Sequence, residues 1–597
     1  MTDQAANIST PAVLSVEQSA SGRRWENREG DDRMARAISQ QYDLPDVVGR
    51  LLVARGVDVN DVDSYLNPTL KDLLPNPSIL QDMDLAAGHL SAAIQNGEKI
   101  AVFGDYDVDG ATSSALLTRF LSAVSVPPRI YIPDRLKEGY GPTAGAMTLL
   151  ADEGVKVVIT VDCGISSFDP LAVAKNAGLE VIVVDHHVAE ATLPEAVAVI
   201  NPNRLDEDGS LGHLAAVGVS FLLVIAVNRA LREAGWYQSR PEPKLMQWLD
   251  LVALGTVCDV VPLKGLNRAL VIQGLKVMAG RTNTGLSALS DSAKIDRRPE
   301  VYHAGFVLGP RINAGGRVGR ADLGSVLLSS NDPVQAEAIS AELEVFNAER
   351  RTIEAIVQEE AIAGIDINGE PPQGIVIAIG KNWHPGVIGI VASRLKDRYQ
   401  RPALVIAIDD KGEGKGSGRS VKGVDLGAAV IAARQAGLLV NGGGHAMAAG
   451  ITITEAKCAE LVGFLEERLT PQVAALGVVR GLGIDGVLNV KGANTDLVDL
   501  LQQVGPFGAG NSEPRFAIAD ARVIKASIVG QGHVSCIFTG RDGGRLKGIA
   551  FRIAETQLGQ ALLAAQGKEI HVAGHLKTDS WQGRTDVQIF IDDISLK

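Results

Sequence analysis

The chain has 597 residues, of which 46% are hydrophobic and 21% are charged, and its formal net charge is −13. This length and apolar content favour a globular protein of about four domains. No apolar run reaches the roughly 18 residues of a membrane span and the N-terminus has no signal-type apolar core, so we expect a cytoplasmic protein without a membrane partner. The four cysteines lack C-x-x-C spacing, which argues against a disulfide framework and a zinc site.

The first 30 residues are polar, and we expect them to be disordered. From 98 to 260, short β-branched runs such as KIAVF, KVVITV and EVIVV alternate with helical stretches. Near-continuous apolar strands separated by helices predict a parallel sheet that is covered on both faces, as in a doubly wound α/β fold. We assign residues 31–330 to this domain.

Residues from Asp332 onward lack glycine and proline for some 30 positions and carry apolar side chains at helical spacing, which predicts a connecting helix over 331–366. Residues 367–470 repeat the α/β pattern in a smaller domain that would face the first across a cleft. Residues 471–597 are rich in β-strands, with a helix between the third and fourth of five strands. This order is typical of an OB-type β-barrel that binds single strands, with a generic small barrel as the alternative.

The negative net charge does not exclude a nucleic-acid partner, because binding depends on where positive side chains gather. Residues 521–552 carry six basic side chains and one acidic side chain. Two further basic clusters lie at 394–401, on a predicted helix, and at 411–422, in a glycine-rich segment that we expect to be a loop. Each cluster alone is typical of a solvated surface, so only their combination favours a phosphate backbone as the partner.

Four short acidic segments each follow an apolar run: GDYDVDG (104–110), VDCG (161–164), VDHH (184–187) and CD (258–259). Because the carboxyl ends of parallel strands share one crevice, carboxylates just beyond several strands converge there. Mixed carboxylate and imidazole ligands without thiolate suit Mn²⁺ or Mg²⁺. A helix cap explains one such Asp, but it does not explain all of them together.

This constellation predicts a metal-dependent phosphoesterase. Hydrolysis of a phosphodiester near neutral pH needs a strong oxygen nucleophile and neutralised charge on the attacking and leaving oxygens, which two divalent ions provide. Asp162 could bridge the ions through its two oxygens, and His186 supplies an imidazole nitrogen. His187 is a candidate to support the ligands or to donate a proton to the leaving oxygen, whereas Asp185 is either a ligand or the group that orients an imidazole.

The acidic motifs resemble the DHH phosphoesterase superfamily, and the chain from about residue 100 onward is similar to its RecJ family of bacterial single-strand-specific 5′ to 3′ DNA exonucleases. The resemblance extends over RLKEGY (135–140), LGPRINAGGR (308–317), NWHPGVIGIVASRL (382–395), GSGRS (416–420), GGGHAMAAG (442–450) and PFGAGNSEPRF (506–516). It implies a DHH catalytic domain at 31–330, a DHHA1 domain at 367–470 and an OB-fold nucleic-acid-binding domain at 471–597.

The resemblance also implies a set of metal ligands. The ligands of two ions, Mn²⁺ or Mg²⁺, would be drawn from Asp105, Asp107, Asp109, Asp162, His186 and Asp259. Many superfamily members have a histidine four residues before the middle Asp of the first motif, where this chain has Phe103. That difference leaves open whether Asp105 takes over as a ligand.

Substrate-binding residues follow from the resemblance in the same way. Arg311, Ser417 and Arg419 would hold the 5′ phosphate. Tyr140, beside Arg135, would stack on a base without sequence preference. Two further residues, Arg317 and His445, would line the cleft. The alternative for the two arginines, 311 and 317, is an interdomain salt bridge.

The function implied by the resemblance is an exonuclease that degrades single-stranded DNA to mononucleotides in DNA repair and recombination, with single-strand binding protein and a helicase as further partners. One alternative is a DHH phosphodiesterase that acts on short oligonucleotides or cyclic dinucleotides, but such an enzyme does not need the long helix and the terminal barrel. A second alternative is a non-catalytic single-strand-binding scaffold, which should have lost the acidic ligands that this chain keeps.

Overall fold

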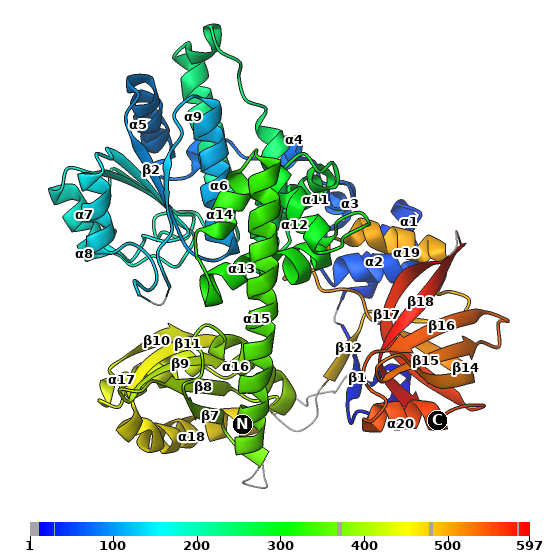
Figure 1. Ribbon diagram of the computed structural model, residues 1–597. Coiled ribbons are helices and arrows are strands. Elements are labelled where there is room, and N and C mark those ends of the chain that lie inside the picture. The colour runs from blue at the N-terminus through cyan, green and yellow to red at the C-terminus, as the bar shows by residue number, and fades with distance from the viewer. Residues whose placement is uncertain (1–10, 29, 136, 367–372, 477–480, 582–583) are drawn as a thin grey trace, which may run out of the picture. The chain divides into compact units, whose positions relative to one another are not determined.

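The computed structural model describes residues 11–28, 30–135, 137–366, 373–476, 481–581 and 584–597 (Figure 1). The chain forms two compact units. The sheet unit contains residues 75–261 and 270–478, and the barrel unit contains residues 1–74, 262–269 and 479–597. In the described part of the chain no helix is both long and apolar enough to cross a membrane.

The first half of the sheet unit is built on a parallel sheet of five strands in the order β3-β2-β4-β5-β6. The strands are β3 (Arg129–Tyr131), β2 (Ile100–Gly104), β4 (Val157–Val161), β5 (Glu180–Val184) and β6 (Ala198–Ile200). Figure 1 shows helices α7 (Ala144–Asp152) and α8 (Phe168–Asn176) on one face, and α5 (Met83–Asn96), α6 (Val108–Ala123) and α9 (Ala216–Glu233) on the other. Because both faces are covered, nearly every residue of β2, β4 and β5 is buried, and the predicted doubly wound fold is confirmed.

Helices complete this half of the unit. They are α10 (Leu249–Cys258), the part of α11 (Gly265–Ala279) from residue 270 onward, α12 (Thr284–Ser292), a π-helix (His303–Leu308), α13 (Gly309–Val318), α14 (Leu323–Ser329) and α15 (Pro333–Asp366). The predicted connecting helix is α15, whose 34 residues span about 51 Å at 1.5 Å per residue.

The second half of the sheet unit has five strands in the order β10-β11-β9-β8-β7. Its elements are β7 (Val376–Lys381), α16 (Ile388–Tyr399), β8 (Ala403–Ile408), β9 (Glu413–Arg419), α17 (Leu426–Gln435), β10 (Asn441–His445), β11 (Ala448–Thr454) and α18 (Cys458–Ala475). The expectation of a glycine-rich loop is wrong for 413–419, which form the central strand β9. Its glycines alternate with polar residues and face the core, where a Cβ on Gly416 would lie 2.4 Å from the side chain of Ile451. Large neighbours therefore fill the space that strand side chains normally occupy.

The barrel unit contains a sheet in the order β13-β14-β15-β16-β18-β17, which the pairing of β14 with β17 closes into a five-stranded barrel. The strands are β13 (Gly486–Leu488), β14 (Phe516–Val529), β15 (His533–Thr539), β16 (Arg545–Ala550), β17 (Glu569–Trp581) and β18 (Arg584–Leu596). Helix α20 (Gln557–Ala564) lies between the third and fourth barrel strands in the chain, so the predicted OB-type barrel is confirmed.

The N-terminal segment belongs to the barrel unit, which corrects two expectations. Strand β1 (Arg24–Asn27) pairs with β12 (Gly481–Ile484), and the fully buried Trp25 donates a hydrogen bond from Nε1 to Asp593 Oδ2 over 3.1 Å. The predicted disorder of residues 1–30 is therefore wrong for 11–28, while residues 1–10 lie outside the described part of the chain. A few apolar side chains in a polar sequence suffice to anchor it.

Residues 31–74 likewise pack in the barrel unit and not with the parallel sheet to which the sequence assigned them. Helices α1 (Asp32–Gln41), α2 (Asp46–Val53) and α3 (Val62–Leu66) share one hydrophobic core with α19 (Thr495–Val504) and the barrel. Leu51 and Leu52 are fully buried in that core. The two ends of the chain therefore fold together.

Candidate metal centre

Three strands and one helix deliver the acidic motifs to a single place. Asp105 follows β2, Asp162 follows β4, and Asp185 and His186 follow β5, all at the carboxyl edge of the parallel sheet. Asp259 instead caps the C-terminus of helix α10, which corrects the expectation that it follows a strand. The apolar run before it, LVALGTVC, lies in the helix that the sequence pattern predicts near 244–257, which is confirmed.

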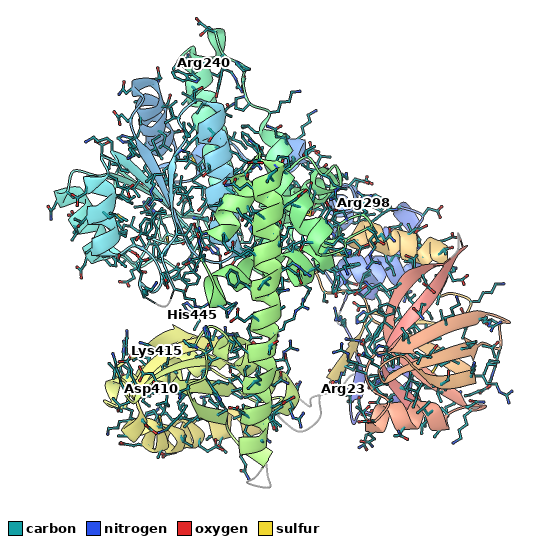
Figure 2. All side chains as sticks on the ribbon, in the orientation of Figure 1. Arg23, Arg240, Arg298, Asp410, Lys415 and His445 are labelled. Atoms are coloured by element: carbon teal, nitrogen blue, oxygen red, sulfur yellow. The ribbon has the colours of Figure 1, made fainter. Side chains whose placement is uncertain are left out.

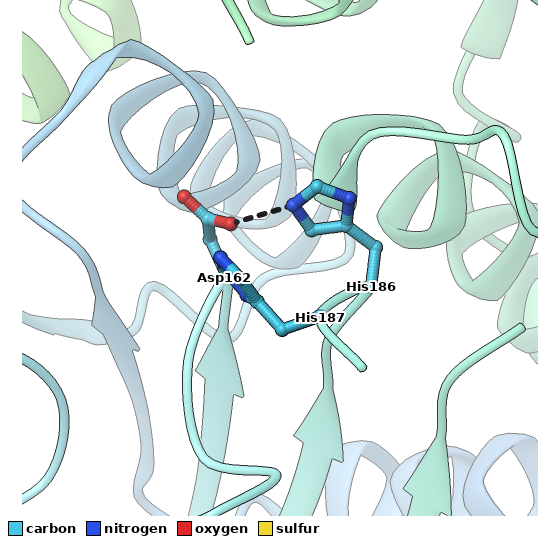
Figure 3. A group of neighbouring side chains, drawn as sticks. All are labelled: Asp162, His186 and His187. Carbon is cyan, nitrogen blue, oxygen red and sulfur yellow. Dashed lines mark ion pairs between the residues drawn. The ribbon is translucent and has the colours of Figure 1, made fainter. Parts of the chain in front are cut away.

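The ring of His186 lies at the centre of this group. Its Nε2 lies 3.3 Å from Asp162 Oδ1, 3.6 Å from Asp259 Oδ2 and 4.0 Å from Asp109 Oδ2. Figure 3 shows the ring directed at the Asp162 carboxylate. Three overlapping sets of possible ligands have all their ligand atoms within 4.8 Å of one another: Asp162–His186–His187, Asp109–His186–Asp259 and Asp105–Asp107–Asp162.

Backbone amides orient two of the carboxylates of the first motif. Asp107 is the N-cap of α6, and its Oδ1 accepts hydrogen bonds from the amides of Asp109 and Gly110. Asp109 accepts from the first amides of helix α9, those of Ala216 and Val217, over 2.6 and 2.9 Å. Each carboxylate is thus both a helix cap and a member of the acidic group, because a helix N-terminus attracts negative charge.

Close approach of the backbone makes glycine necessary next to these ligands. A Cβ on Gly110 would lie 2.4 Å from the carbonyl oxygen of Asp105, and a Cβ on Gly255 would lie 3.0 Å from Asp109 Oδ1. Asp162 itself has φ of 60°, a left-handed conformation that is rare for residues other than glycine and asparagine. Such strain concentrates at functional sites, where the surrounding structure holds it.

Four buried atoms of this group have no hydrogen-bond partner: Asp105 Oδ1, Asp162 Oδ1, His186 Nε2 and Asp259 Oδ2. A buried polar atom without a partner costs about 1 to 3 kcal/mol, and more when it is charged. All four are oxygen or imidazole donors of the kind that divalent cations bind. The residues present therefore fit a divalent metal ion, which would satisfy buried ligand atoms that form no hydrogen bond within the protein.

The shifted pKa values of this group also favour a bound cation. Burial, and after it repulsion from neighbouring carboxylates, raises the pKa of Asp105 to about 8, of Asp109 to about 7 and of Asp259 to about 9, and raises that of Asp162 well above its ordinary value. Burial, and then the adjacent His187, lowers the pKa of His186 to about 4, so its ring is a neutral ligand near pH 7. A cation would relieve this repulsion.

Asp185 has a different role from the other carboxylates. Its Oδ1 lies 2.7 Å from His187 Nδ1, and its two oxygens accept hydrogen bonds from the amides of Ile165, His186 and His187. Burial opposes its ionisation, but these hydrogen bonds hold the pKa of Asp185 below its ordinary value and, in turn, raise the pKa of His187. Asp185 therefore orients the imidazole, which is one of the two roles that the sequence left open.

The position that holds a histidine in many superfamily members is filled by a buried aromatic ring. Phe103 is fully buried and stacks on Tyr131 with ring centroids 5.1 Å apart. It offers no ligand, whereas Asp105, two residues later, keeps one buried oxygen without a partner.

Three of the expected substrate-binding residues, Arg317, Ser417 and Arg419, form one group. Arg317, on α13, donates from Nη1 to the carbonyl of Gly386 over 2.9 Å. Burial, and then the positive charges of Arg135 and Arg350, lowers the pKa of Arg317 to about 10, and Arg419 is a further positive neighbour. Arg419 donates to Ser417 Oγ over 3.1 Å on β9. Three guanidinium groups are thus near enough to Arg317 to repel its charge, an arrangement that an anion would stabilise.

Other expected substrate-binding residues are placed as follows. Arg311 is buried and forms an ion pair with Glu344, 2.5 Å from Nε to Oε2. The Tyr140 hydroxyl donates to the carbonyl of Asp162 over 2.9 Å and lies 3.3 Å from His187 Nδ1, while the guanidinium of Arg135 lies over the ring of Tyr106. His445 is exposed at the end of β10 (Figure 2) and has no described contact with the other residues of this set.

Arg350 was not anticipated from the sequence. It lies on α15, forms an ion pair with the buried Glu354 over 2.8 Å, and has a buried Nε without a partner. The same carboxylate binds Arg394 of α16, so the pair fixes α15 to the second sheet. Nothing in the run AERRTIEA separates this arginine from an ordinary helix-surface residue.

Comparison with known families divides the chain in the same way. The model of the DHH family N-terminal domain matches residues 99–256, that of the DHHA1 domain matches 372–470, and that of the RecJ OB domain matches 484–593. Each family model thus covers a region whose fold is described above.

Relatives resemble the chain over almost its whole length. The single-stranded-DNA-specific exonuclease RecJ of Salmonella typhimurium is 36% identical over 92% of this chain and 96% of its own length, and the protein of that name from Bacillus subtilis is 32% identical over 97% of this chain and 71% of its own length. The structure of Thermus thermophilus RecJ in complex with Mn²⁺ has a TM-score of 0.78 and 29% identity, and covers 94% of this chain and 78% of that protein. A second structure, with Mg²⁺, gives a TM-score of 0.71, 28% identity and coverage of 95% of this chain and 77% of that protein. The chain belongs to the RecJ family of single-stranded-DNA-specific exonucleases.

Proposed function

We propose that this protein is a metal-dependent exonuclease that degrades single-stranded DNA from the 5′ end to mononucleotides, in DNA repair and recombination. The observation that carries the proposal is the convergence of four buried ligand atoms without hydrogen-bond partners, from Asp105, Asp162, His186 and Asp259. Relatives that share most of the chain are named single-stranded-DNA-specific exonucleases, and a related structure contains Mn²⁺.

Two divalent ions, Mn²⁺ or Mg²⁺, would be held by residues from Asp105, Asp107, Asp109, Asp162, His186 and Asp259. Asp162 belongs to two of the three possible ligand sets, which supports it as the residue whose two oxygens would contact both ions, while His186 would contribute its Nε2 to one of them. When bound, the ions activate a water molecule and neutralise charge on the phosphate. The lack of a ligand at Phe103 supports Asp105 as the residue that takes its place.

His187 acts in proton transfer in this proposal. Its ring, half exposed, is held by Asp185 in one orientation and with a raised pKa, so it carries a proton that it can donate to the leaving oxygen of the cleaved nucleotide. The Tyr140 ring meets the His187 ring edge-on with centroids 5.9 Å apart, next to the acidic group. Tyr140 is 48% exposed and is placed to stack on a base of the substrate.

The arginine group would bind the phosphates of the strand. Arg135, Arg317 and Arg419 place positive charge where no carboxylate pairs with them among the described contacts, and Ser417 adds a hydroxyl. Arg311 would hold the terminal phosphate once it exchanges Glu344 for that ligand, and His445 would contact the strand from β10. Single-strand binding protein and a helicase are proposed as partners by family analogy.

The test is a cleavage assay with the full chain and Mn²⁺ or Mg²⁺, on oligonucleotides labelled at the 5′ or the 3′ end. We expect mononucleotides to be released from the 5′ end of single strands, with no activity in chelator and little on blunt duplexes. Degradation only from the 3′ end, or of dinucleotides alone, would contradict the proposal.

Asp162→Ala provides the matched variant for this assay. It should abolish cleavage yet leave strand binding in chelator unchanged, since the arginine group is intact. Val345→Ala, an exposed substitution on α15, is the control and should leave both unchanged.

A further inference from the structure

Two aromatic rings are exposed on the π-helix that precedes α13, and neither belongs to the candidate metal centre. Tyr302, the N-cap of the π-helix His303–Leu308, is 58% exposed, and Phe306 within that helix is 74% exposed. Their rings stack on each other with centroids 5.6 Å apart and an interplanar angle of 20°. Two adjacent large rings left in water mark a binding surface more strongly than scattered apolar residues do.

The π-helix packs directly on the end of the helix that carries Asp259. A Cβ on Gly309 would lie 2.5 Å from Cys258 Sγ, and a Cβ on Gly305 would lie 3.2 Å from Val257 Cγ1. The Cys258 thiol also donates to the carbonyl of Ala304 over 3.4 Å. π-Helices are rare in proteins, but those that occur are often found at functional sites. Here the glycines let one lie against the neighbours of a candidate metal ligand.

The same segment is continuous with the phosphate-binding elements. The π-helix runs without a break into α13, which carries Arg311 and Arg317. The buried side of the π-helix holds His303, Ala304 and Leu308, so the exposed side is left to the two rings. The helix that carries the aromatic pair therefore packs on the residues just before Asp259 and continues into the helix that carries two candidate phosphate ligands.

The residues just before the rings carry both signs of charge, with Arg297 and Arg298 beside Asp296 and Glu300. Arg297 donates from Nε to the ring of His303 over 3.2 Å, and the adjacent Arg298, labelled in Figure 2, is exposed. Aromatic faces beside cationic side chains are the combination that binds single-stranded nucleic acid, through base stacking and phosphate contacts. Continuity with α13, which carries Arg311 and Arg317, favours a nucleic-acid strand as the occupant over a protein surface.

We propose that Tyr302 and Phe306 form a stacking platform for the bases of single-stranded DNA that lie beyond the nucleotide being cleaved. This inference rests on the proposed function and assigns it a further binding site. Because every base has an aromatic face, the platform would hold any sequence. It would also disfavour a duplex, whose bases are already stacked and paired.

The test measures binding and cleavage separately. Affinity for a fluorescent single-stranded oligonucleotide is measured by anisotropy in chelator, for the full chain and for Tyr302→Ala, Phe306→Ala and Phe306→Leu. Each loss of a ring should weaken binding about 10-fold. The same variants are then measured on an oligonucleotide of equal length in which the bases beyond the first few are abasic, where the wild-type protein should bind more weakly and the variants should lose little further.

Controls separate stacking from general damage. Phe306→Tyr and Tyr302→Phe keep a ring and should retain wild-type affinity, and Val334→Ala, 76% exposed on α15, should have no effect. Unchanged affinity in both alanine variants, or an equal loss on normal and abasic strands, would overturn the platform. An absence of strand cleavage by the wild-type protein would contradict the proposed function, while the binding comparison would still decide the platform.

Discussion

At the scale of single residues, the site is defined by carboxylates that are costly to keep ionised. Folding raises the pKa of Asp105 and Asp259 to about 8 and about 9, chiefly through burial. A carboxyl with a raised pKa binds more protons in the folded than in the unfolded chain, so without metal the stability of the fold falls as pH rises from about 4 toward 9. Metal binding requires the deprotonated carboxylates and therefore opposes this loss.

The affinity of the site for divalent metal should therefore depend on pH. Between about pH 6 and about pH 8.5, the affinity for Mg²⁺ should rise with pH and binding should release protons, and the increase in Tm on adding Mg²⁺ should be larger at the higher pH. Calorimetric titrations in buffers of different ionisation enthalpy count the protons. Asp105→Asn and Asp259→Asn should each reduce that count, and a pH-independent affinity would show that these carboxyls are not the ligands.

A second prediction concerns Asp185, which orients His187 and lies outside the ligand group. Asp185→Asn should lower the pKa of His187 and reduce kcat about 10- to 100-fold. Affinity for Mn²⁺ should change by much less than in Asp162→Asn, which serves as the comparison. If Asp185→Asn lost metal as completely as Asp162→Asn, Asp185 would be a ligand and not a positioning residue.

At the scale of elements, the parallel sheet was predictable and several other elements were not. Apolar runs that end in Asp or His specified β2, β4 and β5 and the edge at which Asp162 and His186 meet. Strand β1 gave no such signal, because it is short and polar and its partner β12 lies near the other end of the chain. Strand β9 could not be predicted because its glycines are typical of a loop. Only the structure shows that large side chains lie opposite them.

Some features of the helices could not be predicted from the sequence either. The π-helix cannot be separated from an α-helix by pattern, and the exposure of Tyr302 and Phe306 depends on tertiary packing. Arg350 shows the same limit, since only the structure brings it near Arg317. The sequence thus located the ligands through their strands, and it missed groups whose role depends on contacts between helices.

A substitution at Trp25 would test whether the N-terminal strand stabilises the barrel unit. It is fully buried and bonded to Asp593, so Trp25→Ala should destabilise the barrel unit by about 3 to 5 kcal/mol. Urea denaturation measures the change in the free energy of unfolding, and hydrogen exchange of barrel amides shows whether the change lies in the barrel unit. Arg23→Ala, at a partly exposed neighbour, is the control, and a stability equal to wild type in Trp25→Ala would mean that the segment is not part of the fold.

At the scale of the whole molecule, an acidic protein is expected to bind a polyanion through local charge. Two of the six basic residues at 521–552 form ion pairs with carboxylates: Arg541 pairs with Glu569, and Lys547 pairs with Asp586. Arg522 and Lys525 are exposed on β14 of the barrel. The electrostatic contribution of the barrel is therefore smaller than the count in the sequence indicates.

The double variant Arg522→Glu/Lys525→Glu tests that contribution. It should weaken binding of single-stranded DNA and lower the dependence of log Kd on log salt by about 1.4, if each residue neutralises one phosphate. Binding titrations at several salt concentrations provide the slope. Arg541→Glu/Lys547→Glu is the matched control with a smaller expected effect, and an unchanged slope in the first variant would remove the barrel from the DNA-binding surface.

The central claim is that carboxylates and an imidazole from distant parts of the chain hold divalent metal for hydrolysis. Anomalous diffraction from crystals grown with Mn²⁺ tests it most directly. We expect manganese peaks at about 2.0 to 2.3 Å from oxygens of Asp162 and from His186 Nε2, with Asp105 or Asp259 completing the ligands. Protein that cleaves single strands in Mn²⁺ while its crystals show no manganese among these residues would contradict it.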